Sequence, residues 1–99
     1  MSFVITQPEA LAAAAGHLNG VGSALEAQNA TAVLPTTVLP PAAADTVSAL
    51  VATQFSAQGA RYRAVGAQAI AVHQMFTAIL AASSGSYATT EAANNIAVS

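Results

Sequence analysis

Apolar side chains recur at helical spacing along the first third of the chain. Leu11, Leu18 and Leu25 stand seven residues apart, with alanine and valine residues between them. This spacing places them in one narrow stripe on an α-helix, because two helical turns take about seven residues. The pattern therefore predicts a first helix over about residues 7–33.

The start of this helix carries a capping signal. Thr6 can cap the first turn, Glu9 follows three residues later as its reciprocal partner, and Pro8 lies where its missing N–H is harmless. Three glycines then weaken the helix by about 1 kcal/mol each relative to alanine. They are Gly16, Gly20 and Gly22. Such a helix needs a close neighbour.

Prolines separate the first helix from a second one. Pro35 disfavours helical geometry in the residue before it, and Pro40 with Pro41 prevents continuation, so a hinge is predicted over about residues 34–44. Asp45 is a suitable N-cap for a second helix over about residues 45–83. The "SSGS" segment is expected to end that helix and to leave residues 84–99 as a polar tail.

The second helix carries its large side chains in two adjacent columns. These residues are Val51, Val65, Val72 and Ile79 in one column and Phe55, Tyr62 and Phe76 in the other. A third column, of mostly small residues, comprises Ala52, Gly59, Gly66, His73 and Leu80. The small residues predict that another helix lies close along much of this one. The first helix is too short and narrow to cover all three columns, so an apolar face is left over.

The expected fold class is therefore all-α, an antiparallel two-helix hairpin. A hairpin encloses no core, and an exposed apolar face of this extent usually marks an interface. Two assemblies fit the pattern equally well. One is a four-helix homodimer, and the other is an obligate heterodimer with a different helical protein.

Composition and charge exclude several classes of function. The chain is 55% hydrophobic and 6% charged, with a net charge of -2, so it has no basic patch for nucleic acid. Its N-terminus lacks the positive and bulky apolar regions of a cleavable signal peptide. The apolar stretch 64–82 is long enough to span a membrane. Polar residues on several of its sides argue against that interpretation.

Candidates for catalysis or metal binding are few. The chain has no cysteine, and its histidines and carboxylates are His17, His73, Asp45, Glu9, Glu26 and Glu91. Neither histidine has a second ligand at helical metal-binding spacing, and no nucleophile motif is present. We therefore expect no enzymatic activity, no cofactor and no metal site.

Four segments in order carry a family resemblance across essentially the whole chain. They are "MSFVITQPEALAAAAG", "PTTVLPPAAADTVSAL", "QFSAQGARYRAV" and "SGSYATTEAAN". Together they resemble the PE family of mycobacteria, whose signature is the pair Pro8 and Glu9. The resemblance implies a single PE domain over residues 1–99, without the long extensions that many members carry.

The resemblance also implies a biology. A PE protein forms an obligate heterodimer with a PPE-family protein, and its hairpin completes a four-helix bundle with that partner. An EspG-type chaperone holds the pair through the PPE subunit, and a type VII secretion system exports it. The protein would be made in the cytoplasm and then be secreted or held at the cell surface, with no cleavable N-terminal signal peptide.

The segment "YATTE" fits the family's secretion motif, Tyr-x-x-x-Asp/Glu, at Tyr87 and Glu91. In a helical conformation these two side chains would share one face. The expected partner interface comprises Leu11, Leu18, Leu25, Val51, Phe55, Tyr62, Val65, Val72, Phe76 and Ile79. Gln58 and His73 are expected to help select the partner. The alternative is a homo-oligomeric or membrane-associated helical protein of the cell envelope.

Overall fold

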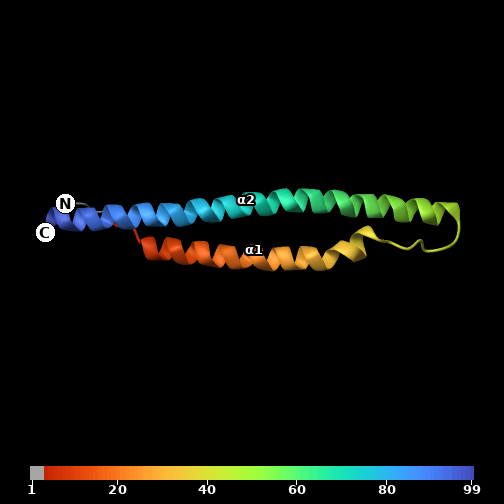
Figure 1. Ribbon diagram of the computed structural model, residues 1–99, viewed down its shortest axis with the longest axis horizontal. Coiled ribbons are helices and arrows are strands. Elements are labelled where there is room, and N and C mark those ends of the chain that lie inside the picture. The colour runs from red at the N-terminus through yellow and green to blue at the C-terminus, as the bar shows by residue number, and fades with distance from the viewer. Residues whose placement is uncertain (1–3) are drawn as a thin grey trace. The chain divides into compact units, whose positions relative to one another are not determined.

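The protein is described by a computed structural model over residues 4–99, so the first three residues of the predicted domain lie outside the described part. Two long helices account for most of it: α1, Pro8–Thr37, and α2, Thr46–Val98 (Figure 1). Residues 4–99 contain no β-strand. The chain divides into two compact units. The terminal unit comprises the described part of Met1–Gly22 with His73–Ser99, and the loop unit comprises Ser23–Val72.

Helix α1 begins at Pro8, one residue after the predicted start near residue 7, and its cap differs from the prediction. The Gln7 carbonyl accepts bonds from the backbone N–H groups of Ala10 and Leu11, at 3.0 and 3.3 Å, which makes Gln7 the N-cap residue. Thr6 donates both its N–H and its hydroxyl to Glu91 instead. The predicted reciprocal box of Thr6 and Glu9 is therefore wrong, because a residue 85 positions away takes the Thr6 N–H.

The predicted end of the first helix, near residue 33, is also wrong. Helix α1 continues through Pro35 to Thr37. Two threonine hydroxyls donate to carbonyls of its last turns, Thr36 to Ala32 at 2.6 Å and Thr37 to Val33 at 2.6 Å. Both hydroxyls bond to the carbonyl four residues earlier in the helix. The N–H that Pro35 lacks would have reached the Thr31 carbonyl, so these two bonds do not replace it. The connection to α2 is correspondingly short, residues 38–45.

Asp45 caps α2 as the sequence predicts. Its Oδ2 accepts a bond from the Ser48 backbone N–H at 3.1 Å, and its Oδ1 accepts one from the Ser48 hydroxyl at 2.7 Å. These two hydrogen bonds, the hydroxyl bond first, hold the pKa of the Asp45 carboxyl below its ordinary value.

The predicted polar tail is wrong, because α2 continues without a break to Val98. Gly85 does not have a positive φ, so "SSGS" forms ordinary helix. The Ser84 hydroxyl donates to the Pro8 carbonyl oxygen at 2.6 Å, and Ser84 is buried. The hydroxyls of Ser86 and Thr89 donate to carbonyls four residues earlier. Contact with the start of α1 thus overrides the local helix-breaking preference.

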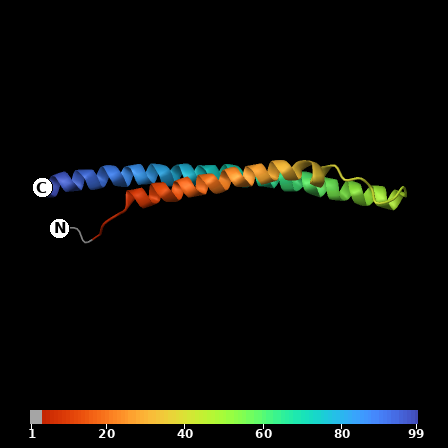
Figure 2. The ribbon, with the colours of Figure 1, turned by 90° about the horizontal axis from the view of Figure 1, so that it is seen from below.

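In the terminal unit, the start of α1 lies beside the second half of α2 (Figures 1 and 2). Pro8 contacts Ser84, and the Leu18 carbonyl oxygen lies 2.6 Å from His73 Nε2, so the two segments run antiparallel. Its buried residues are small ones: Pro8, Ala15, Gly22 and Ser84. The core of this unit is therefore a thin seam between two helices.

In the loop unit, the helices approach even more closely. A Cβ atom added at Gly59 would overlap the Thr36 carbonyl oxygen, so only glycine fits at this crossing. On the connection, the Leu39 N–H donates to the Ser56 hydroxyl at 3.4 Å. The pairs Thr36 with Gly59 and Leu39 with Ser56 again indicate antiparallel segments.

The all-α prediction is confirmed for residues 4–99, and the antiparallel pairing inside each unit is consistent with a helical hairpin. A four-helix bundle with a partner stays a prediction.

Candidate interaction surface and C-terminal motif

One face of α2 packs against α1 and carries small or polar side chains. Its partly buried residues include Ala52, Gly59, Gly66, His73 and Leu80, the column of small residues that the sequence predicts to face a helix. A second column beside it, spaced by seven residues, contains Ile70, Thr77, Ser84 and Glu91, and it is partly or fully buried. The prediction that a helix lies close to the small-residue column is confirmed.

The large side chains of the two predicted columns of α2 are exposed. We call this set the outer face: Val51, Phe55, Tyr62, Val65, Val72, Phe76 and Ile79. Their exposed fractions run from 47% for Val51 to 66% for Val72. On α1, Leu11 and Leu18 are partly buried and Leu25 is exposed. Leu11 and Leu18 therefore contribute more to the contact between α1 and α2 than the residues of the outer face do.

Tyr87 and Glu91 lie on the side of α2 whose earlier residues, up to Ser84, face α1. Tyr87 stands seven residues after Leu80, and Glu91 stands seven after Ser84, so they extend the two inner columns. Helix α1 begins at Pro8, which contacts Ser84. No residue of α1 therefore lies beside the part of α2 that follows Ser84 and carries Tyr87 and Glu91. Tyr87 is consequently 46% exposed. A shallow groove beside it is lined by Ile79, Ala82, Ser83, Ser86 and Thr90.

The segment before α1 contacts Glu91. Thr6 donates to Glu91 Oε1 from its hydroxyl at 2.8 Å and from its N–H at 3.3 Å. Val4 and Ile5 line a second groove together with Glu91, Asn94 and Asn95. The residue pattern near either terminus did not predict this contact. The seven-residue spacing from Thr77 through Ser84 to Glu91, continued past "SSGS", was the signal that could have found it.

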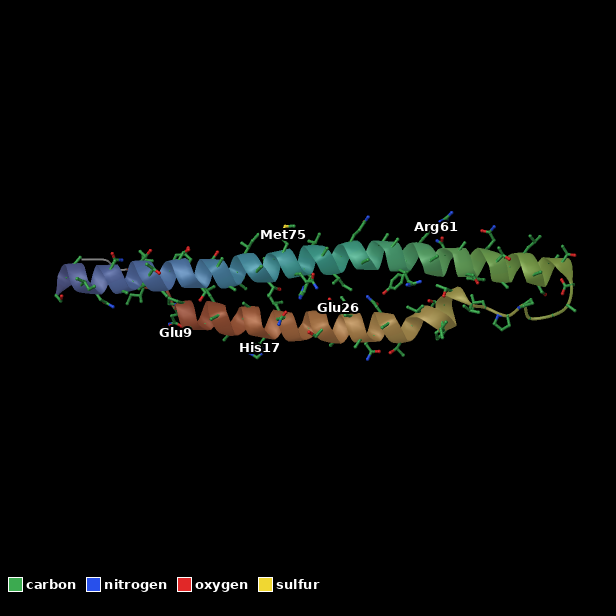
Figure 3. The ribbon with its side chains drawn as sticks, viewed as in Figure 1. Glu9, His17, Glu26, Arg61 and Met75 are labelled. Atoms are coloured by element: carbon green, nitrogen blue, oxygen red, sulfur yellow. The ribbon has the colours of Figure 1, made fainter. Side chains whose placement is uncertain are left out.

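The two histidines lie in different settings. His73 Nε2 is 2.6 Å from the Leu18 carbonyl oxygen, and a Cβ atom at Gly22 would come within 2.9 Å of the His73 ring. His73 is therefore engaged inside the chain, which leaves less of it for partner selection than the sequence suggested. His17 points away from α2 in Figure 3.

Other polar side chains of α2 remain on its surface. Gln58 Oε1 accepts a bond from an Arg61 guanidinium nitrogen at 3.1 Å, and both residues are exposed. In Figure 3 Arg61 and Met75 point away from α1 within their own units. Among the described residues, no group of three or more histidine, cysteine, aspartate or glutamate side chains is placed to hold a metal ion.

The fold and surface define a small all-α protein whose large apolar side chains are mostly exposed. The chain belongs to the PE family, whose profile matches residues 4–94. It is 52% identical to PE family protein PE13 of Mycobacterium tuberculosis, with all of both chains aligned.

Longer relatives share the same region. The chain is 50% identical to PE family protein PE8 of M. tuberculosis, where 98% of this chain aligns with 35% of that protein. It is 51% identical to the PE-PGRS family protein PE_PGRS33 of M. tuberculosis, where 95% of this chain aligns with 19% of that protein. The chain therefore spans the whole of one relative and only a minor part of the other two.

Proposed function

We propose that this chain is a non-enzymatic, exported interaction module that forms a heterodimer with a PPE-family protein. The observation that carries the proposal is the outer face of α2, seven large apolar side chains that α1 leaves exposed. A partner that presents two antiparallel helices would cover this face and complete a four-helix bundle. Leu25 would extend the interface onto α1.

The size of the outer face supports an obligate partner. Its side chains are roughly half to two-thirds exposed. Burying what remains exposed would contribute roughly 6–13 kcal/mol. Association itself costs about 4–15 kcal/mol. The free energy gained by burial and the free-energy cost of association are thus of similar size. A partner therefore has to cover most of the outer face to bind stably. A short peptide that covers one or two side chains would not suffice.

Tyr87 and Glu91 are proposed as the export signal of this heterodimer, read by a type VII secretion system. An EspG-type chaperone would act on the pair through the PPE subunit, before the pair leaves the cytoplasm for the cell surface or the medium. The exposed ring of Tyr87 and its groove offer an aromatic contact, and Glu91 offers a carboxylate one helical turn later.

Co-expression tests the heterodimer. The chain would be produced alone and together with the PPE protein encoded beside its gene, and each sample would be analysed by size-exclusion chromatography with light scattering. We expect a soluble one-to-one complex that forms only on co-expression. Phe55→Asp, on the outer face, should abolish it, whereas Ala57→Asp, at an exposed position outside the outer face, should not. A well-behaved homodimer that ignores the PPE protein would refute the proposal.

The same outer face supports a second candidate, a homo-oligomeric or membrane-associated protein of the cell envelope. By length and composition alone α2 could cross a membrane, and none of its most apolar window is buried inside the structure. Sedimentation with anionic and neutral lipid vesicles separates this candidate from the first. Binding of the isolated chain to vesicles that persists in the presence of the PPE protein would favour the second candidate.

A further inference from the structure

Residues near the N-terminus contact α2 on either side of the proposed export signal. Two hydrogen bonds join residues 6–8 to α2, from Ser84 to Pro8 and from Thr6 to Glu91. Tyr87 lies between these two contact points along α2. The signal residues therefore do not stand on an independent tail.

The contact at Ser84 fixes where the N-terminal segment meets α2. Its hydroxyl donates to the Pro8 carbonyl at 2.6 Å, and both residues are buried. Loss of this buried hydrogen bond would cost free energy, so the contact holds the start of α1 at this point. Thr6, two residues before Pro8, is then close to Glu91, which lies seven residues, or about two helical turns, after Ser84.

The bonds from Thr6 orient the Glu91 carboxylate and use only one of its two oxygens. Both bonds from Thr6 end on Oε1, one from the hydroxyl and one from the N–H. A carboxylate has about four lone-pair sites. Thr6 thus leaves Oε2 of Glu91 able to accept other bonds, and Glu91 is only partly buried. Bonds from two donors to one oxygen restrict the rotamers of a long side chain, which would otherwise be fixed only when a receptor binds.

We propose that Thr6 is a positioning residue of the export signal, so that the recognised element is a tertiary one formed by residues 84–91 of α2 and the segment 4–8. The inference rests on the proposed role of Tyr87 and Glu91 in export. It adds that a receptor meets an oriented Glu91 carboxylate beside an exposed Tyr87, on a surface to which both ends of the chain contribute.

Four variants test the proposal in a host that exports the heterodimer. Thr6→Val keeps the shape of the side chain and removes its hydroxyl, and Thr6→Ser keeps the hydroxyl. Thr31→Val is the matched control, since Thr31 is exposed and its hydroxyl donates only to Ala27, four residues earlier in α1. Glu91→Ala reports on the export signal itself. The exported fraction would be measured by quantitative immunoblotting of medium and cells.

A hydrogen bond to a charged group supports an expected loss of about tenfold or more in the oriented state, and hence in export, for Thr6→Val. Thr6→Ser should export nearly as well as the wild type, and Thr31→Val should match the wild type. The positioning role is overturned if Thr6→Val is exported normally or more efficiently while Glu91→Ala is not exported. It is equally overturned if Thr6→Ser fails as badly as Thr6→Val.

The export assay gives a different result if Tyr87 and Glu91 are not the export signal at all. If Tyr87→Ala and Glu91→Ala are both exported normally, the two residues are not the signal, whatever Thr6 does. Hydrogen exchange in the purified heterodimer supplies a readout that does not depend on export. Amides in the N-terminal segment should exchange faster in Thr6→Val and Glu91→Ala than in Thr31→Val. Unchanged exchange in both variants would show that the contact does not hold the segment in solution, and would overturn the proposal.

Discussion

The terminal unit and the loop unit hold the same two helices together by different means. In the terminal unit, polar side chains bridge the segments: Thr6 to Glu91, Ser84 to Pro8, and His73 to Leu18. In the loop unit the helices touch backbone to backbone at Gly59 and Thr36. One side-chain bond in that unit, from the Leu39 N–H to the Ser56 hydroxyl, is long at 3.4 Å.

The difference follows from side-chain size. A glycine lets two helix backbones approach until their own atoms are in contact, and such a contact is strong but tolerates no added atom. A serine, threonine or histidine keeps the backbones further apart and fills the gap with a directional bond. The Gly59 crossing of the loop unit should therefore be sensitive to added volume, and the Ser84 contact of the terminal unit to loss of its hydroxyl.

The largest effect is expected for Gly59→Ala. Its new Cβ would overlap a backbone oxygen that cannot rotate away, so the helices have to separate, at a cost of about 1–3 kcal/mol. Thermal unfolding followed by circular dichroism measures this loss.

Gly20→Ala is the matched control in the terminal unit, because nothing lies within 4 Å of the added Cβ. Its higher helix propensity should stabilise the protein by about 0.5–1 kcal/mol. The volume argument at Gly59 is contradicted if both alanine variants shift stability in the same direction.

Ser84→Ala should have an intermediate effect. It removes the hydroxyl that donates to Pro8 and leaves that buried carbonyl without this donor, at a cost of about 1–2 kcal/mol. Ser86→Ala is the control, since the Ser86 hydroxyl is exposed and bonds only to Ala82. Denaturant unfolding of the two variants measures the difference. Equal stabilities would mean that the Pro8 contact contributes nothing.

The smallest effect is expected at the start of α2, where the depressed pKa of Asp45 links the cap to pH. The cap is fully effective above the ordinary carboxyl pKa of 3.8 and is lost as the pH falls through the lower folded value. The wild type should therefore lose stability in acid relative to Asp45→Asn, which titrates no carboxyl at this position. Melting temperatures of the two proteins, compared between about pH 6 and pH 2, provide the check. A difference that stays constant over that range would contradict it.

Local signals in the sequence succeeded where the neighbouring residues alone decide the structure. Asp45 caps α2 because its carboxylate reaches the N–H of a residue three positions away. The column through Gly59, Gly66 and His73 faces a helix because helical period and residue size are both visible in the sequence. Family membership likewise followed from ordered segments that span the chain.

Local signals failed where a distant residue competes for the same group. Thr6 has a local capping partner in Glu9, yet its N–H bonds to Glu91. "SSGS" is typical of a helix end, yet Ser84 is buried against Pro8 and the helix continues. Pro35 is a separate case: it is typical of a helix stop, yet α1 continues through it to Thr37.

The sequence by itself thus determined the two helices, the cap of the second one, its small and large columns, and the PE family. Periodicity, capping and residue size act over a few positions, so they are visible in the order of the residues alone. Only the tertiary structure decided that the C-terminal segment is helical and that Thr6 meets Glu91. Those outcomes depend on which groups come together across 76 and 85 residues of chain, and burial then makes each hydrogen bond costly to lose.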